Sequence, residues 1–587
     1  MLGTIVIIVV LALVVRAAWR FLDTYWFRPK KLEKILRKQG LTGNPYRFFF
    51  GDARETGKMF KESYSKPIGI TDDIAPRVIP FVTKTLRTYG EKSFIWVGPK
   101  PVVFIFDLEA MKVILNKYVL FQKSFKESNP IFKRLVGGLL VYEGEQWSQN
   151  RKKLNPAFHL DKLKELVNTM QKQGQETLDE WSSMMPKDGS PLVVDVYPYL
   201  KVYTGCVVSH TLFSTPPTPL VKRTFTIISE LTHISNQAQP FTIPGEKYFL
   251  KKYRRANEIE DELTATFTGM IEERLKKRKV GERKGEPDLF DLVVDELEEL
   301  DSNDKNARAA AVYEIIQQCK LFYVAGHETT ANLITWTIVM LSYHKEWQTR
   351  AREEVFQVLG DRQNITADDL ANLKYVNRGS RLLSSLSLCR TLYILKTEQA
   401  LPSRVRYRRR YSDAQVSIEN FIRSSRDRGP PFSGIRLPLT VSEIIHVTMI
   451  VNETLRLFPP AVELTRVVEE ETTLGDLVLP KGSMVMMPVV LLHRDPKIWG
   501  DDAMEFRPDR FAEGVLKAAN GHSAFLPFGW GVRTCIGANL ATMEAKSFIA
   551  LFLRNFSFEL SPKYAHAPMV TLLMQPQYDV PVVMRKL

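Results

Sequence analysis

The chain carries, at residues 525–546, the stretch FLPFGWGVRTCIGANLATMEAK. This composition indicates a glycine-rich loop that delivers one cysteine, Cys535, to the start of a helix predicted from about Asn539 through Lys546. Glycines allow tight turns and let the backbone approach a flat ligand closely. Loop amides and the helix N-terminus can hold the sulfur as a thiolate, and Arg533 can meet an anionic group. The stretch therefore predicts a thiolate ligand site.

Two other interpretations of this loop are weaker. A lone cysteine is usually a small buried apolar residue, but the glycines and the arginine around Cys535 favour a ligand. A dinucleotide-binding loop needs three glycines after an apolar strand. Here Thr534 stands where the third glycine belongs, and no apolar strand leads cleanly into the loop.

Five positions match the pattern Phe-x-x-Gly-x-Arg-x-Cys-x-Gly, namely Phe528, Gly531, Arg533, Cys535 and Gly537. In this pattern the chain resembles the haem loop of the cytochrome P-450 family. The resemblance implies a mainly α-helical fold with small β-sheets and haem b as the cofactor. It makes Cys535 the axial ligand of the iron, places the other four residues against the haem, and gives Arg533 a haem propionate to bind.

The composition of the whole chain argues against other classes of protein, namely disulfide scaffolds, zinc modules and nucleic-acid-binding proteins. Of 587 residues, 44% are hydrophobic and 11% aromatic, which is ample for a large core. Its four cysteines are far apart and form no C-x-x-C or zinc pattern. The formal net charge is +15, but no nucleic-acid recognition motif accompanies it. We therefore expect an anionic membrane surface or an acidic partner protein, and no nucleic acid.

The N-terminus predicts a membrane anchor. Residues 2–15, LGTIVIIVVLALVV, are apolar and uncharged, and the apolar stretch continues to about Phe27. A cleaved signal peptide is the alternative, but no basic segment precedes the apolar core and no small-residue cleavage site is evident. We favour an uncleaved single-pass anchor over residues 1–27. Cations follow it within residues 28–38, so the catalytic domain, 28–587, is predicted on the cytosolic side of the endoplasmic reticulum membrane.

Further motifs extend the resemblance. In GEQWSQNRKKL, Trp147 and Arg151 are four residues apart and would share one face of a helix. Taken alone this pair is weak evidence, because any amphipathic helix supplies such pairs. The resemblance implies that both residues hold a haem propionate, together with Arg466 of ELTRVVEE.

A long helix is predicted over about 308–343, with AGHETT at its centre. Gly326 costs helix stability, and the polar pair Glu328 and Thr329 is expensive in an apolar segment unless it is used. The alternative is that both side chains only satisfy backbone groups or face water. The resemblance implies an oxygen-side groove in which these two residues organise proton delivery.

The segment MIVNETLRLFPP carries Glu453 and Arg456 on a predicted helix that ends at two prolines. Such a pair is usually an ordinary surface contact. The resemblance implies a buried structural pair completed by Arg510 of the later segment FRPDRF.

One segment, 377–447, departs from the family pattern, because joining Val376 to Thr448 restores the family's spacing. It holds 13 Lys and Arg against 5 Asp and Glu, a charge of +8, and +15 − 8 leaves +7 for the rest. This composition predicts a disordered insert in the catalytic domain. A regulatory or partner-binding loop is one interpretation; translated intervening sequence is the one we favour.

The segments RPKKLEKILRKQGLTGNPYR, SFIWVGPKP and NPAFH resemble the plant microsomal group that includes secologanin synthase and triterpenoid oxidases. This implies a monooxygenase that uses O2 and electrons from NADPH-cytochrome P-450 reductase, since no flavin or nicotinamide motif occurs here. By family position the pocket would draw on the segment near 121–140 and on Phe322, Ala325, the turn at Val462 to Leu464, Leu573 and Met574. Mostly apolar residues favour a hydrophobic, terpenoid-type substrate. An oxygen-independent isomerase and an isoform impaired by the insert remain open.

Overall fold

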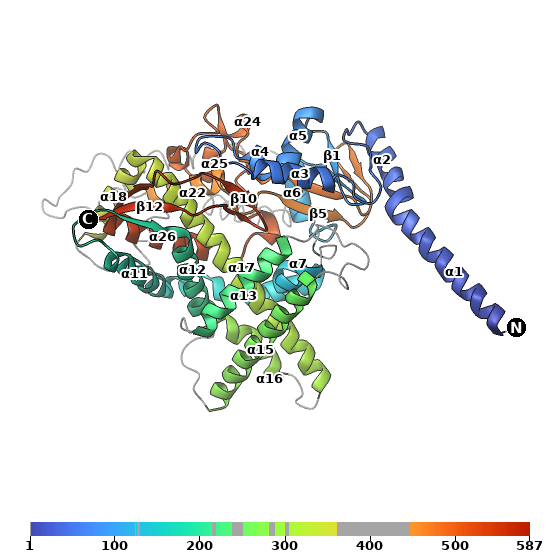
Figure 1. The fold of residues 1–587 in the computed structure, drawn as a ribbon, viewed down its shortest axis with the longest axis horizontal. Coiled ribbons are helices and arrows are strands. Elements are labelled where there is room, and N and C mark those ends of the chain that lie inside the picture. Colours follow the sequence, from blue (N-terminus) through green and yellow to red (C-terminus); the bar gives the residue numbers. More distant parts are fainter. Residues whose placement is uncertain are drawn as a thin grey trace, which may run out of the picture. The chain divides into compact units, whose positions relative to one another are not determined.

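The computed structural model describes residues 2–123, 125, 130–213, 219–236, 251–280, 288–299, 304–360 and 446–587. Within this part of the chain, long helices dominate and the strands are short (Figure 1). The predicted mainly α-helical fold with small sheets is confirmed. Most of the predicted insert, up to residue 445, lies outside the described residues.

The central element is α17, Lys305–Tyr343, which confirms the helix predicted over 308–343 (Figure 1). Asp304 begins it by accepting hydrogen bonds from two backbone amides of the first turn. From Ile315 to Ser342 almost every residue is buried, as expected for a helix that is apolar around its whole circumference. It packs against α12 (Val196–Phe213), α26 (Ala538–Asn555), α22 (His446–Leu457) and α16 (Leu289–Glu299).

The other helices surround this core or connect to it. The longer ones are α1 (Leu2–Leu22), α2 (Arg28–Lys38), α3 (Ala53–Ser63), α5 (Pro80–Tyr89), α6 (Leu108–Asn116), α9 (Gly144–Leu154), α11 (Val167–Ser183), α13 (Pro219–Asn236), α15 (Lys251–Lys279) and α18 (Lys345–Leu359). The shorter ones are α4 (Ala75–Val78), α7 (Pro130–Leu135), α8 (Gly138–Val141), α10 (Leu160–Glu165), α23 (Val489–Leu492), α24 (Pro496–Trp499) and α25 (Val515–Ala518).

The largest described sheet has five strands in the order β1-β2-β8-β5-β3. They are β1 (Phe94–Val97), β2 (Lys100–Phe104), β8 (Met484–Met487), β5 (Leu464–Val468) and β3 (Phe121–Gln122). The apolar runs FIWVG and PVVFIF predict a β-hairpin, and the antiparallel β1-β2 pair confirms it, with Phe94 opposite Val103. Pairing of β2 with β8 is parallel, and the other pairings in this sheet are antiparallel.

Three smaller sheets complete the architecture. A three-stranded sheet joins β4 (Leu192–Asp195), β12 (Pro581–Lys586) and β9 (Phe556–Leu560). Two hairpins pair β10 (Pro568–Val570) with β11 (Met574–Pro576) and β6 (Thr472–Leu474) with β7 (Leu477–Leu479). The β10-β11 hairpin lies close to α17, which brings the C-terminal region to the central helix.

The N-terminal helix α1 continues through one π-helical segment, Asp23–Phe27, into α2. The helical run Gly3–Lys38 is long and apolar enough to cross a membrane. The most apolar 18 residues of this run have a mean hydropathy of 2.5, and none of them is buried. No described part of the protein therefore covers this apolar surface. This helix is a candidate membrane anchor.

The start of α22 corrects one predicted boundary. The backbone amides of His446 and Val447 donate to the two carboxylate oxygens of Glu354 on α18, at 3.0 and 2.8 Å. Glu354 thus satisfies two amides that a helix N-terminus leaves without an intrahelical partner. The last two residues of the predicted 377–447 insert therefore belong to the helix, and the predicted C-terminal boundary is wrong by two residues.

Candidate active site

The loop before α26 holds Cys535 by its backbone. The Cys535 amide donates to the carbonyl of Phe528 at 2.9 Å, and α26 begins at Ala538, one residue before its predicted start. Gly531 has a φ of +74°, and a Cβ there would lie 2.8 Å from the side-chain oxygen of Asn116. A residue other than glycine would be strained at this position.

Gly537 lies in a turn, as predicted, but its backbone differs from that of Gly529 and Gly531, which have a positive φ. Its φ is −88°, which any residue can adopt. A Cβ there would lie 4.0 Å from the Cys535 sulfur and 4.0 Å from a ring carbon of Phe158, which is ordinary contact. The Gly537 amide donates a hydrogen bond to the sulfur, which partly opposes the rise that burial causes in the pKa of the Cys535 thiol.

The Cys535 sulfur faces an internal space. Burial raises the pKa of the Cys535 thiol, opposed by the Gly537 amide, Arg151 and Lys123. The side chain is nevertheless exposed. A side chain that is accessible and yet desolvated by surrounding protein lies on an internal wall rather than on the outer surface.

The middle of α17 shows a similar opening. Ala325 is exposed, and Gly326 and Thr329 are partly accessible, although the helix around them is buried. The ring of Phe158 lies 6.0 Å from that of Phe322 on α17, and the same Phe158 ring lies beside Gly537. Phe158 therefore connects the cysteine loop to the helix that faces it.

Among the described residues, four cations gather near the cysteine, and one carboxylate accompanies them. The cations are Lys123, Arg151, Arg466 and Arg533. Glu143 forms an ion pair with Arg533 and accepts a hydrogen bond from the Lys123 amide at 3.0 Å. Because one carboxylate cannot balance four cations, the cluster carries surplus positive charge in a desolvated place.

The pKa values of the cations in this cluster reflect the same surplus of positive charge. Desolvation, followed by repulsion from Arg533, lowers the pKa of Arg466 to about 10. Desolvation and the nearby Arg533 and Arg466 lower the pKa of Lys123 to about 7. The buried Nε of Arg533 has no hydrogen-bond partner in the part of the chain that the structure describes. These groups suit a dianionic ligand, and the two propionates of a haem supply that charge.

The predicted residues of α9 reach this cluster. The Arg533 guanidinium lies 4.7 Å above the ring of Trp147, and Arg151 donates to the carbonyl of Thr534 at 2.8 Å. Trp147, Arg151, Arg466 and Arg533 thus converge as predicted, although they come from three distant segments. Lys123 lies in the segment near 121–140 that was predicted to contribute to the pocket, but no motif or spacing in FQKSF marks it as a cation of this cluster.

The triad of Glu453, Arg456 and Arg510 is present and buried. Arg456 donates to both oxygens of Glu453, at 2.7 and 2.8 Å, and Arg510 donates to Glu453 at 3.0 Å. Arg456 also donates to the carbonyls of His493 and Ala503, at 2.6 and 2.5 Å. Glu453 and Arg456 have no exposed surface. The predicted buried pair is therefore confirmed.

His493 connects this triad to the cysteine loop. The Leu526 amide donates to His493 Nε2 at 2.9 Å, so Nδ1 carries the proton and donates to the Arg456 carbonyl at 3.1 Å. Desolvation and the Arg456 charge lower the pKa of His493 to about 3. His493 was not predicted, since nothing in its local sequence shows that it touches residues 33 positions away.

The side chains of the predicted pair, Glu328 and Thr329, lie on different faces of α17. Thr329 lies on the accessible face, where its hydroxyl donates to the Ala325 carbonyl at 2.6 Å. Glu328 is 4% exposed, and desolvation raises the pKa of its carboxyl, opposed by Lys201. Adjacent helix positions are about 100° apart, so Glu328 points toward α12 while Thr329 faces the opening.

The predicted pocket residues differ in how much of each is exposed. Ala325 is exposed, and Leu464 and Leu573 are partly accessible. Phe322, Val462 and Met574 are 6%, 5% and 0% exposed, so they support the pocket wall in this conformation more than they line it. Their contact with a substrate stays a prediction.

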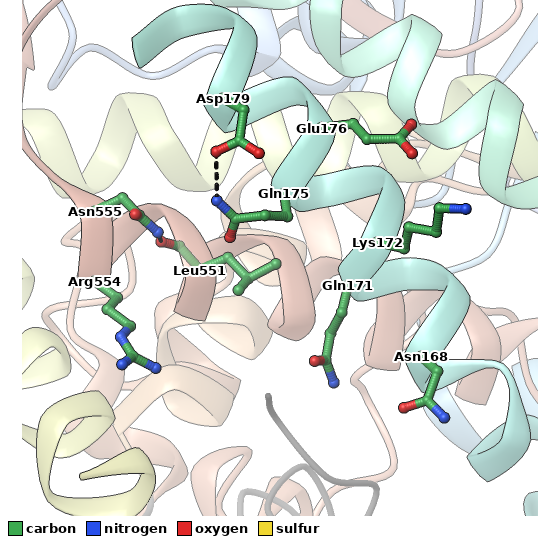
Figure 2. Close-up of a pocket in the computed structure, with 9 residues that line it drawn as sticks. All are labelled: Asn168, Gln171, Lys172, Gln175, Glu176, Asp179, Leu551, Arg554 and Asn555. Carbon is green, nitrogen blue, oxygen red and sulfur yellow. Dashed lines mark hydrogen bonds between the residues drawn. The ribbon is translucent and has the colours of Figure 1, made fainter. Parts of the chain in front are cut away.

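A surface groove of about 810 Å³ lies elsewhere, between α11 and α26 (Figure 2). All of its lining residues except Leu551 are polar or charged, and Gln175 donates to Asp179 across one helical turn at 2.8 Å. It is lined by Asn168, Gln171, Lys172, Gln175, Glu176, Asp179, Leu551, Arg554 and Asn555. None of the predicted site residues lines it, so we place the active site at Cys535 and α17.

Comparison with known proteins gives the class. The family model described as Cytochrome P450 matches residues 77–378 and 440–581. The chain belongs to the cytochrome P450 family and is a haem-dependent monooxygenase. Members of this family act on small molecules with O2 and redox partners. The unmatched stretch, 379–439, lies within the predicted insert, which stays a prediction.

The relatives are plant enzymes. The 7-deoxyloganic acid hydroxylase of Catharanthus roseus is 38% identical, covering 100% of this chain and 99% of that protein. Cytochrome P450 CYP72A219 of Panax ginseng is 37% identical, covering 98% and 97%. Secologanin synthase 2 of Catharanthus roseus is 36% identical, covering 98% and 96%. The predicted resemblance to the plant group with secologanin synthase is confirmed.

Proposed function

We propose that this protein is a membrane-anchored haem-thiolate monooxygenase in which Cys535 is the axial ligand of haem b. The observation that carries the proposal is the Cys535 sulfur, which is accessible although the protein around it desolvates it. Among the described residues, four cations lie near it, and only one carboxylate, that of Glu143, accompanies them. A thiolate on iron and two propionates on the cations would remove this imbalance.

The residues of the site divide into holding and orienting roles. Cys535 ligates the iron, and the Gly537 amide donates to its sulfur. Arg466, Arg533, Arg151 and Lys123 bind the propionates, and Trp147 supports Arg533 from below its guanidinium. Phe528 fixes the loop through its carbonyl, and Gly531 makes the turn that aims it.

The bound haem supplies dioxygen activation, which a thiolate ligand favours by donating electron density to the iron. Thr329 holds a hydroxyl proton at the accessible face of α17, where it can be passed toward the ligand side. Behind that face, desolvation raises the pKa of the Glu328 carboxyl, which favours proton uptake there. Transfer between the two then needs a water or a side-chain rotation, because the helix directs them apart.

The substrate is a hydrophobic, terpenoid-type small molecule. The accessible pocket residues Ala325, Leu464 and Leu573 are apolar, and two relatives are named for 7-deoxyloganic acid hydroxylation and secologanin synthesis. Electrons come from NADPH through NADPH-cytochrome P450 reductase. Helix α1 anchors the enzyme in the endoplasmic reticulum membrane, with residues 28–587 in the cytosol.

Spectroscopy of the reduced, carbon monoxide-bound protein tests the haem assignment. We expect the red-shifted Soret band of thiolate ligation in the wild type, and its loss in Cys535→Ser. Cys206→Ala, at a buried cysteine of α12, is the matched control and should keep the band. A thiolate-type band that survives Cys535→Ser would refute the proposal.

A second candidate function, an isoform impaired in haem binding, is favoured by the stretch that the family model leaves unmatched. Residues 376 and 447 are both valine, so deleting 377–447 gives the same chain as deleting 376–446 and removes only His446 from the start of α22. We expect this deletion to raise haem occupancy or turnover. Equal haem content and equal reductase-supported turnover in both forms would show that the insert is tolerated.

A further inference from the structure

Glu143 stands at the start of α9 but does not cap this helix. Its backbone is extended, with φ −128° and ψ 166°, as is usual for an N-cap residue. Within the described range 130–213, however, its side chain makes no hydrogen bond to the amides of the first turn. The residues preferred at an N-cap are Ser, Thr, Asp, Asn and Gly, so a glutamate here needs another explanation.

The carboxylate of Glu143 joins two distant segments instead. One oxygen accepts a hydrogen bond from the amide of Lys123, directly after β3, at 3.0 Å. The other oxygen forms an ion pair with Nη1 of Arg533 in the cysteine loop. Only 7% of the Glu143 side chain and 2% of the Arg533 side chain are exposed. Because water is largely excluded, both interactions are stronger than they would be on the surface.

Arg533 is held on three sides by the segment 142–147. Its Nη1 is paired with Glu143, its Nη2 donates to the carbonyl of Tyr142 at 2.6 Å, and its guanidinium lies 4.7 Å from the centroid of the Trp147 ring. The remaining nitrogen, Nε, is buried and has no hydrogen-bond partner in the described chain. This arrangement fixes the direction of the guanidinium and leaves its Nε available to a ligand.

Glu143 also supplies the negative charge nearest to the other cations of the cluster. Arg151 and Arg466 each donate to an uncharged backbone carbonyl at 2.8 Å, and neither forms an ion pair within the described residues. Desolvation lowers the pKa of Lys123, Arg466 and Arg533, and the charge of Glu143 opposes that fall in all three. One carboxylate therefore acts on most of the cluster.

The charge of Glu143 bears on the redox chemistry of a bound haem. With Glu143 ionised, the four cations exceed this carboxylate and two haem propionates by one charge, and without Glu143 they exceed the propionates by two. A more positive surrounding favours the reduced state of an iron centre, and charges act strongly where water is excluded. Glu143 should therefore keep the reduction potential lower than the cations alone would set it.

We propose that Glu143 is a positioning residue for the haem: it aims Arg533 at a propionate, and its charge lowers the reduction potential of the bound iron. This inference rests on the proposed haem site. Because the same carboxylate holds the Lys123 amide, it also fixes the end of β3 relative to the cysteine loop. Groups that orient the residues around a cofactor tune both its retention and its potential.

Two measurements on the full-length holoenzyme test this assignment. A redox titration followed by haem absorbance gives the reduction potential, and transfer of haem to excess apomyoglobin gives the rate of haem loss. Glu143→Gln removes the charge but keeps an oxygen that can accept from the Lys123 amide. It should shift the potential to a more positive value with little change in haem loss. Glu143→Ala removes both contacts and should in addition speed haem loss by about 10- to 100-fold.

Glu145→Gln is the matched control. Glu145 is an exposed acid in the first turn of α9, where it accepts a hydrogen bond from Gln149 at 3.0 Å. Its loss should leave the potential and the rate of haem loss as in the wild type, because solvent screens its charge.

Two results would overturn the inference. A residue that only stabilised the fold would change the rate of haem loss but not the potential of the haem still bound, so an unchanged potential in both Glu143 variants contradicts the assignment. Slower haem loss in Glu143→Gln contradicts it as well, since Glu143 would then compete with the propionates for Arg533.

The carbon monoxide spectrum of the same preparations separates this inference from the proposed function. An absent thiolate band in the wild type would count against Cys535 as the ligand. A normal band together with an unchanged potential in both variants would count against Glu143 alone.

Discussion

The cysteine side of the active site and the accessible face of α17 are built in opposite ways. On the cysteine side, charged groups are held by named partners, as Arg533 is by Glu143 and by the Tyr142 carbonyl. The face of α17 presents an alanine, a glycine and a threonine whose hydroxyl is bonded to its own helix. One side is a rigid polar frame, and the other leaves open space.

This difference separates stability from chemistry. A change within the polar frame leaves a buried charge or carbonyl without its partner, which destabilises the fold. A change on the open face of α17 removes few contacts, so its effect should be on turnover. Four substitutions test this contrast, ordered from the largest expected effect to the smallest.

Arg456→Ala should have the largest effect. It leaves Glu453 buried with a partial partner and frees the carbonyls of His493 and Ala503. Breaking a buried ion pair costs about 3–5 kcal/mol, so urea unfolding should show a loss of that size together with loss of haem. Arg507→Ala removes an exposed ion pair to Asp502 and should cost below about 1 kcal/mol. Equal losses in both would contradict the contrast.

Thr329→Ala should leave stability almost unchanged and impair chemistry. Without the hydroxyl, proton delivery fails, and product per NADPH consumed should fall about 10- to 100-fold. Thr335→Ala, which removes a buried hydroxyl one and a half turns further along α17, is the control. If product instead forms from a hydroperoxide without NADPH or O2, the isomerase alternative is correct.

His493 should make the cysteine side sensitive to acid. Its pKa is about 3 in the folded protein and near 6.5 when unfolded, so the unfolded state binds a proton first as pH falls. Stability that is present above pH 6.5 is therefore lost below it, by about 2 kcal/mol between pH 7 and pH 5. His493→Gln should show a shallower pH dependence of unfolding. The same slope in both proteins would exclude His493 as the source.

Gly531→Ala should have the smallest effect of the four. The left-handed backbone at φ +74° costs about 1–2 kcal/mol for a residue with a Cβ, and the Cβ would press on Asn116. Gly537→Ala, at φ −88° with its nearest contacts at 4.0 Å, should cost less. Thermal unfolding of both variants gives the comparison, and the reverse order would show that the loop adopts another conformation.

Much of the fold was predictable because local patterns specify local backbone. The prolines after Leu457 end α22 as expected, and the apolar run of α17 gives a buried helix. Helix α22 begins at His446, before the segment from Met449 on which it was predicted, because its first amides are satisfied by Glu354 from another helix rather than by a local cap.

The sequence by itself determined the class of site, since the glycines, arginine and cysteine of one short loop specify a thiolate ligand whatever surrounds them. Only the tertiary structure decided which groups meet there. Lys123 and Glu143 reach Arg533 across nearly 400 residues of chain, and Glu328 turns away from Thr329. The physical reason is that burial and pairing depend on packing between distant segments, which local periodicity does not encode.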